Sequence, residues 1–139
     1  MTDAEFEVQQ NRIRALRDKW DDPILAGEAE VTHMFSRDYA DATDETWYKT
    51  VCSARAQWQY QEASFEWNCP NVAKQDDDSL ERIYVHELMH FMVNPMHKKR
   101  SPREEYVCTK LADAFLRVHR RSLRGDVSRW IEEKDASQE

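Results

Sequence analysis

Residues that interrupt secondary structure are scarce in this sequence. Only two glycines and four prolines occur among its 139 residues, and we find no internal repeat, low-complexity tract or linker. This scarcity argues against separate domains, so we expect one folding unit over residues 1–139. The charged and polar tail from about residue 132 is expected to be disordered.

Cysteine is also scarce, and its spacing excludes two common uses. Cys52, Cys69 and Cys108 make an odd number, and no two of them have the CxxC spacing. The pattern therefore predicts neither a disulfide framework nor a cysteine zinc cluster. We expect three reduced, mostly buried thiols. For Cys69, a buried inert thiol is favoured over a thiolate that approaches a metal.

Long apolar runs are absent. No stretch approaches the roughly 20 apolar residues that a bilayer-spanning helix needs. The first residues, Met1 to Glu5, lack the basic start and the apolar run of a secretory signal. We therefore expect a cytoplasmic protein with no membrane partner.

An excess of positive charge is missing as well. The formal net charge is -7, from 27 acidic and 20 basic residues. Nucleic acids and anionic membranes both reward a basic surface, so neither is expected as the main partner. A peptide or protein substrate fits this charge better, whereas the oligomeric state is not indicated.

The residues that are present predict an α+β fold with a small, mainly antiparallel sheet. Apolar periodicity indicates an amphipathic helix over about 4–20, and alternation indicates strands between about 30 and 68. Further helices are predicted from about 79 to 93 and from 101 to near 125. The segment 47–55 fits both periods, and we favour a strand there.

Both later helices have signals at their first turn. Asp78 with Glu81 three residues later has the form of a capping arrangement. In the next helix Ser101 can cap, Pro102 suits the first helical position, and Glu104 can reach back to the cap. Glu104 is therefore expected to have a structural task.

The helix over about 79–93 carries the strongest functional signal, His86-Glu87-Leu88-Met89-His90. Residues four apart share one helix face, so His86 and His90 can present two imidazoles to one ion. A catalytic Zn²⁺ site needs a third protein ligand and a water in its open position. Glu87, one position round, is the expected general base that accepts the proton of this water. The alternative of two satisfied core histidines is disfavoured, because a buried trio without a shared partner costs several kcal/mol.

Three residues are candidates for the third ligand. His97 follows His90 by seven residues, whereas the metzincin pattern needs a histidine at six and a glycine where Val93 stands. Glu104 and Glu105 both open the next helix, which is expected to pack against the first. These two remain the alternatives.

The stripes on this second helix favour Glu105. Glu104 shares a stripe with Val107, Leu111 and Val118, in addition to its capping task. Glu105 lies above a stripe of small residues that would let the two helices approach closely. Thr109, one turn beyond Glu105, is the expected hydrogen-bonding partner that orients a ligand.

With these residues the segment 47–116 resembles the HExxH-plus-Glu metallopeptidases, the gluzincins, in a minimal form. It is similar in particular to short metallopeptidase-like proteins encoded by phages and prophages. In larger gluzincins the ligand glutamate is followed by a small residue at plus three, an aspartate or similar at plus four and alanine at plus seven. Glu105, Cys108, Thr109 and Ala112 occupy these offsets, with Thr109 in place of the aspartate.

The resemblance implies a zincin-like fold, zinc, and hydrolysis of peptide bonds. It also implies that residues 63–67 form an edge strand that holds an extended substrate by β-augmentation. No residue can be matched to the group that stabilises the oxyanion in larger relatives. His33 and His119 are expected to be ordinary surface or half-buried histidines.

Two functions from different classes follow. The favoured one is a zinc-dependent metallohydrolase, a peptidase with Glu87 as general base and His86, His90 and Glu105 as ligands. The alternative is a non-catalytic, zinc-containing protein-binding module, phage-encoded and acting on a host protein. The presence of Glu87 favours the enzyme, because a structural zinc site does not require it.

Overall fold

The structure is a computed structural model, and it describes residues 1–25, 29–38, 45–57, 60–93 and 102–123. The expected α+β class is confirmed. The described elements, in chain order, are α1 (Asp3–Leu25), β1 (Glu30–Ser36), the 3-10 helix η2 (Glu45–Lys49), β2 (Cys52–Gln57), β3 (Glu62–Asn68), α2 (Cys69–Val72), α3 (Asp77–Val93) and α4 (Pro102–Leu123). None of the described helices has the length and apolar character needed to cross a membrane. The tail from residue 132 and the expected helix end near residue 125 lie outside the described residues.

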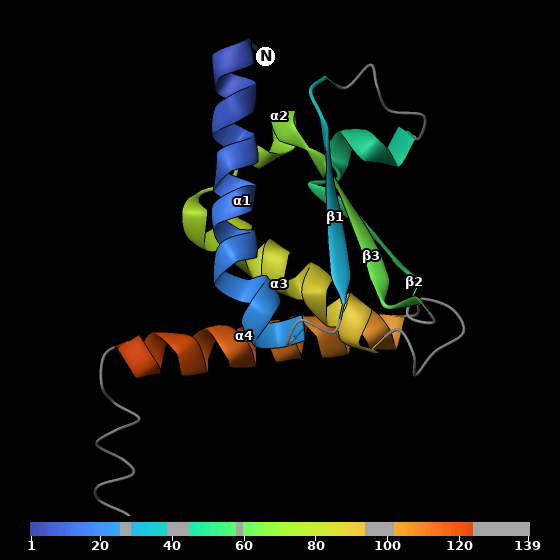
Figure 1. Ribbon diagram of the computed structural model, residues 1–139, viewed down its shortest axis with the longest axis vertical. Coiled ribbons are helices and arrows are strands. Elements are labelled where there is room, and N and C mark those ends of the chain that lie inside the picture. The colour runs from blue at the N-terminus through green and yellow to red at the C-terminus, as the bar shows by residue number, and fades with distance from the viewer. Residues whose placement is uncertain (26–28, 39–44, 58–59, 94–101, 124–139) are drawn as a thin grey trace, which may run out of the picture.

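The sheet has the strand order β1-β3-β2 (Figure 1). β1 pairs with β3 in parallel, and β2 pairs with β3 antiparallel. The sheet is therefore mixed, and the prediction of a mainly antiparallel sheet was wrong. Residues 63–67 belong to the central strand, so the prediction that they form an edge strand was also wrong. Alternation of apolar residues shows which face of a strand is buried, but it does not show which strands become neighbours.

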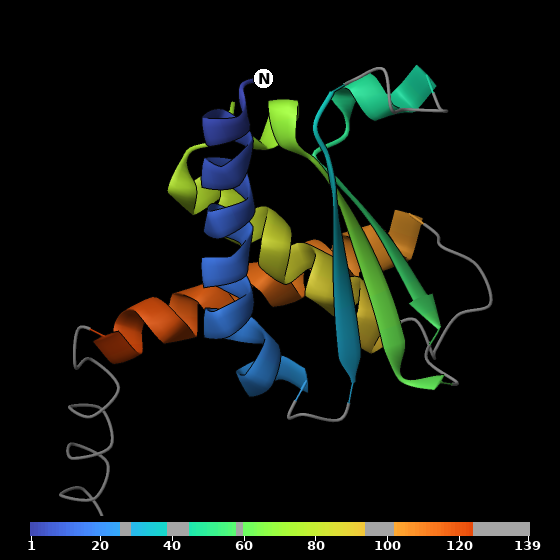
Figure 2. The ribbon, with the colours of Figure 1, turned by 45° about the horizontal axis from the view of Figure 1, so that its top comes forward.

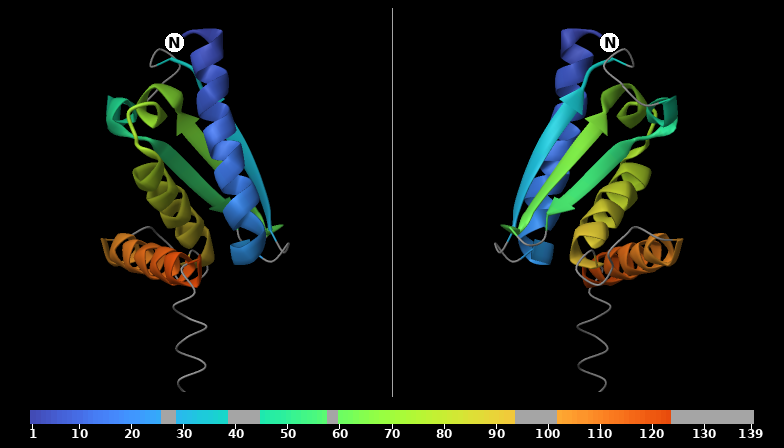
Figure 3. Two further views of the ribbon diagram at one scale, coloured as in Figure 1. Left: turned by 90° about the vertical axis from the view of Figure 1, so that its left-hand side faces the viewer. Right: turned by 90° about the vertical axis from the view of Figure 1, so that its right-hand side faces the viewer.

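One face of the sheet is apolar and faces the helices. Phe65 and Trp67 on the central strand are fully buried there. α1 and α3 cover this face, with α3 beside β2 (Figures 1 and 3). The opposite face carries polar side chains such as Glu30 and Arg55, which are exposed. The core therefore lies between the sheet and these two helices.

The ambiguous segment 47–55 divides into a 3-10 helix and a strand, so the preference for a strand was only half right. Two buried amides hold the turn between them. Asn68 Nδ2 donates to the Trp47 carbonyl at 2.8 Å, and Asn71 Nδ2 donates to the carbonyls of Tyr48 and Thr50, both at 2.9 Å. These acceptors are about 20 residues away in the sequence, so local periodicity does not reveal the contacts.

The start of α3 is set by Asp76, and the prediction of a cap at Asp78 was wrong. The Ser79 N–H donates to Asp76 Oδ1 at 2.7 Å. This hydrogen bond lowers the pKa of the Asp76 carboxyl, because it stabilises the charged form. Glu81 instead accepts a hydrogen bond from Trp20 Nε1 at 2.9 Å. The glutamate therefore ties α3 to α1 instead of closing the first turn.

A chain of hydrogen bonds through the core fixes α3 against the sheet. Trp67 Nε1 donates to His33 Nδ1 at 3.1 Å, and the Tyr84 hydroxyl donates to Asp21. Because His33 Nδ1 accepts, the proton of the neutral ring lies on Nε2, which is 3.3 Å from the Tyr84 oxygen and donates to it. Burial and the bond to Asp21 raise the pKa of Tyr84. The four residues connect α1, β1, β3 and α3.

α4 crosses α3 and runs in the opposite direction (Figure 2). Arg82 on α3 pairs with Asp113 at 3.1 Å, whereas residues later in α3 meet residues earlier in α4. The buried stripe of α4 consists of residues four apart, namely Glu104, Cys108, Ala112 and Leu116. Of the residues that the sequence placed on the stripe of Glu104, Val107 and Val118 are exposed, whereas Leu111 is partly buried against the core. The packed face is therefore the small-residue stripe, and Glu104 lies on it.

Replacing Tyr84 with phenylalanine tests the hydrogen-bonded chain. We expect the free energy of unfolding to fall by about 1–3 kcal/mol, because Asp21 and His33 lose a shared partner in the protein interior. Urea unfolding followed by circular dichroism measures the change. Tyr60→Phe, at an exposed tyrosine, is the matched control and should change stability by less than about 0.5 kcal/mol. Equal effects of the two substitutions would contradict the assigned role.

Candidate metal centre

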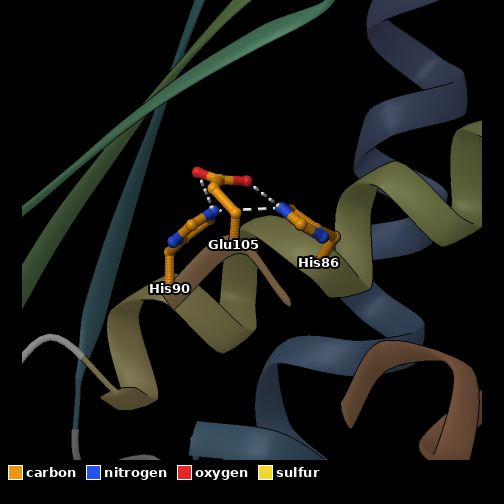
Figure 4. A group of neighbouring side chains, drawn as sticks. All are labelled: His86, His90 and Glu105. Atoms are coloured by element: carbon orange, nitrogen blue, oxygen red, sulfur yellow. Dashed lines mark hydrogen bonds and ion pairs between the residues drawn. The ribbon is translucent and has the colours of Figure 1, made fainter. Parts of the chain in front are cut away.

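Two histidines on α3 face each other across one turn of helix. His86 and His90 are four residues apart, so their side chains leave the helix on the same side. Their Nε2 atoms lie 3.0 Å apart, and the ring planes are inclined at 73°. Figure 4 shows both rings directed toward Glu105 on α4. The pair predicted from the sequence is thus arranged around one point.

The Glu105 carboxylate completes a triangle with these two nitrogens. Its Oε2 lies 3.2 Å from His86 Nε2, and its Oε1 lies 3.1 Å from His90 Nε2. Ligand atoms about 2.0–2.1 Å from a tetrahedral zinc ion are about 3.3 Å apart. The three observed separations are close to this value. We call His86, His90 and Glu105 the outer group.

A polar partner lies behind each imidazole. Thr109 Oγ1 is 3.3 Å from His86 Nδ1, which is the contact expected from the sequence. Glu104 Oε1 is 3.3 Å from His90 Nδ1. Groups in this position fix the ring orientation and the tautomer of histidines that bind a metal through the other nitrogen. Both rings of the outer group are therefore held with Nε2 toward Glu105.

The two carboxyl groups on either side of His90 favour positive charge between them. The Glu104 side chain is only 1% exposed, and when it is ionised it accepts a hydrogen bond from His90 Nδ1–H. In a neutral ring the lone pair of Nε2 then faces Glu105 Oε1 at 3.1 Å. This arrangement is relieved by a cation between them, such as a metal ion or a second proton on His90, and also by a proton on one of the carboxyl groups. The geometry thus favours cation binding at the outer group.

The structure separates the two candidate glutamates clearly. Consecutive residues of a helix are about 100° apart around its axis. Glu105 consequently reaches the Nε2 side of His90, whereas Glu104 reaches the Nδ1 side. The outer group contains Glu105, the favoured alternative. The capping contact expected between Glu104 and Ser101 cannot be followed, because Ser101 lies outside the described residues. His97, the third candidate ligand, also lies outside them.

The outer group is open to solvent on one side. The Glu105 side chain is 51% exposed and that of His86 is 19% exposed, while His90 is buried. Glu87 follows His86 on α3 and is half-buried. Its carboxylate is in neither of the two groups of converging ligand atoms found among the described residues. The predicted base therefore lies next to a ligand without being one of the three.

The remaining residues that the sequence singled out are not part of the outer group. All three cysteines are free and buried, as expected. Burial raises the pKa of the Cys69 thiol to about 11, so the thiol is not ionised at neutral pH. His33 belongs to the hydrogen-bonded chain of the core. His119 is half-buried, with its ring 4.9 Å from that of Trp20.

Sequence reasoning missed one contact of the centre. Cys108 Sγ lies 3.4 Å from His90 Nδ1, next to Glu104. The signal that could have revealed it is the spacing of four between Glu104 and Cys108, which places both on one face of α4. In the sequence Cys108 stood out only as the small residue three positions after Glu105. Its thiol nevertheless reaches the second nitrogen of a predicted ligand.

Comparison with known proteins gives no relative on which to base an assignment. No family model, no curated protein and no solved structure matches this chain. The functional argument therefore rests on the residues and their geometry.

Replacing Glu104 with glutamine tests the support behind His90. The change keeps the size of the side chain but removes its charge, so we expect zinc affinity to fall about 10- to 100-fold. Competition with a chromophoric chelator measures the affinity, and circular dichroism checks the fold. Glu7→Gln, at an exposed glutamate of α1, is the matched control. Unchanged affinity in a folded Glu104→Gln variant would show that Glu104 does not support a metal ligand.

Proposed function

We propose that this chain is a zinc-dependent metallohydrolase of the minimal gluzincin type, acting as a peptidase in the cytosol. The observation that carries the proposal is the convergence of His86 Nε2 and His90 Nε2, 3.0 Å apart, on the Glu105 carboxylate, whose Oε2 lies 3.2 Å from His86 Nε2 and whose Oε1 lies 3.1 Å from His90 Nε2. Two nitrogens and one carboxylate form a ligand set that suits zinc and leaves a coordination position open.

Exposure of the outer group supports a catalytic rather than a structural site. Structural zinc sites are closed by four protein ligands, whereas catalytic sites keep one position for water or substrate. The half-exposed Glu105 lies on the open side of the group. Zinc bound there would act as a Lewis acid and lower the pKa of water towards 7.

Side chains of the protein would supply the proton transfer and hold the two imidazoles in place. Glu87 accepts the proton of the attacking water and delivers it to the leaving nitrogen, as general base and then general acid. Thr109 and Glu104 keep the two imidazoles in place. The outer group and its supports come from two packed helices, which suits chemistry that depends on fixed geometry.

A position for an extended substrate is available beside this helix. β2 pairs with β3 on one side, and no described strand pairs with its other side. Because β2 lies next to α3, this strand is the candidate for β-augmentation by a peptide. This assigns peptide binding to residues 52–57.

Metal content tests the ligand set. We expect the wild-type protein to retain about one zinc ion per chain after dialysis, as a three-ligand site does. Glu105→Ala should lower zinc affinity by more than about 100-fold, since loss of a group behind a ligand already costs 10- to 100-fold. Elemental analysis and chelator competition give the two values. Glu7→Ala is the control and should bind zinc like the wild type. A folded wild type that takes up no zinc would refute the proposal.

Peptide hydrolysis tests the role of Glu87. The zinc-loaded protein is incubated with a mixed peptide library, and new termini are identified by mass spectrometry. Glu87→Gln should reduce the rate about 100- to 10,000-fold without loss of zinc, because only the proton acceptor is removed. If zinc is retained but the wild type cleaves no peptide, the non-catalytic binding module is the better description.

A further inference from the structure

A second group of ligand atoms lies on the other side of His90. It consists of His90 Nδ1, a Glu104 carboxylate oxygen and Cys108 Sγ, all within 4.8 Å of one another. We call it the inner group. His90 Nδ1 is 3.3 Å from Glu104 Oε1 and 3.4 Å from Cys108 Sγ. For bonds of about 2.0 Å to nitrogen or oxygen and 2.3 Å to sulfur, a tetrahedral ion separates such atoms by about 3.3–3.6 Å.

Burial distinguishes the inner group from the outer one. Glu104 is 1% exposed and Cys108 is 0% exposed. A carboxylate in such surroundings needs a positive partner, and a metal ion provides one. The thiol adds a soft donor that the outer group lacks, and this donor favours thiophilic ions such as Zn²⁺, Co²⁺ or Cd²⁺.

We infer that the inner group, His90 Nδ1 with Glu104 and Cys108, is a second binding position for a thiophilic divalent cation, and that it competes with the outer group for His90. Glu104 can supply one oxygen or both, which gives three or four donors. A closed, sulfur-containing set of this kind is typical of ion retention, not of catalysis.

The position of the His90 ring proton explains why the two groups compete for this histidine. When the outer group holds an ion through Nε2, the His90 proton is on Nδ1 and donates a hydrogen bond to Glu104. When the inner group binds an ion, the Cys108 thiol proton passes to solvent, and the His90 proton moves from Nδ1 to Nε2. The Nε2–H then points at Glu105, so His90 is lost to the outer group. One chain consequently holds one ion at either position.

The outer group should hold the ion more tightly in the wild type. Binding at the inner group breaks the contact between Glu104 and His90, and it also requires a buried thiol to ionise. Removal of Glu105 weakens the outer group without touching Glu104 or Cys108. In that variant the remaining affinity for a thiophilic ion belongs to the inner group.

Cobalt titration of the full-length protein tests the inference. Co²⁺ bound to a thiolate gives a sulfur-to-metal charge-transfer band in the near ultraviolet, whereas nitrogen and oxygen ligands do not. The Glu105→Ala variant should bind about one Co²⁺ per chain and show this band, because the inner group coordinates the ion through the Cys108 thiolate. Cys108→Ser added to Glu105→Ala should lose the band. Cys69→Ser in the same background is the control and should keep it.

Two results would overturn the inference. The first is a folded Glu105→Ala variant that binds no Co²⁺, or that binds Co²⁺ without the charge-transfer band. This result does not depend on any cysteine variant. The other is a band that survives Cys108→Ser. Both are separate from the proposed function, which is judged by zinc retention in the wild type and by loss of hydrolysis in Glu87→Gln.

Discussion

The buried contact between Glu104 and His90 is the interaction on which the rest of the centre depends. It places a carboxylate in the protein interior, fixes the proton of His90 on Nδ1, and directs Nε2 toward Glu105. It also sets how α4 is rotated against α3, because Glu104 heads the buried stripe of that helix. Positive charge at His90 is then favoured by the carboxyl groups on both sides of the ring.

α3 serves two purposes on opposite sides. Tyr84 and Leu88 are buried, and Tyr84 joins the hydrogen-bonded chain beside the sheet. His86 and His90 are each two residues further along, about 200° round the helix, and face α4. The core therefore fixes the helix on one side while the other side carries the candidate chemistry.

Much of the fold and of the centre could be predicted from local patterns. The helices at His86 and Glu105 and the spacing of the two histidines depend on residues within a few turns of each other. The contact of Thr109 with His86 joins two helices, and it was expected from the position of Thr109 one turn beyond Glu105. The order of strands could not be predicted, because β1 and β3 become parallel neighbours across about 30 residues of chain. The burial of Glu104 was missed for a similar reason. A capping pattern explained the residue locally, although its partner, His90, lies on another helix.

Zinc K-edge X-ray absorption of the purified wild-type protein tests the central claim most directly, since it reports which atoms surround the metal. The account predicts one zinc ion per chain with only nitrogen and oxygen neighbours at about 2.0–2.1 Å. A sulfur neighbour at about 2.3 Å would place the ion at Cys108 instead of the outer group. That result, or the absence of bound zinc from folded protein, would contradict an open catalytic centre formed by His86, His90 and Glu105.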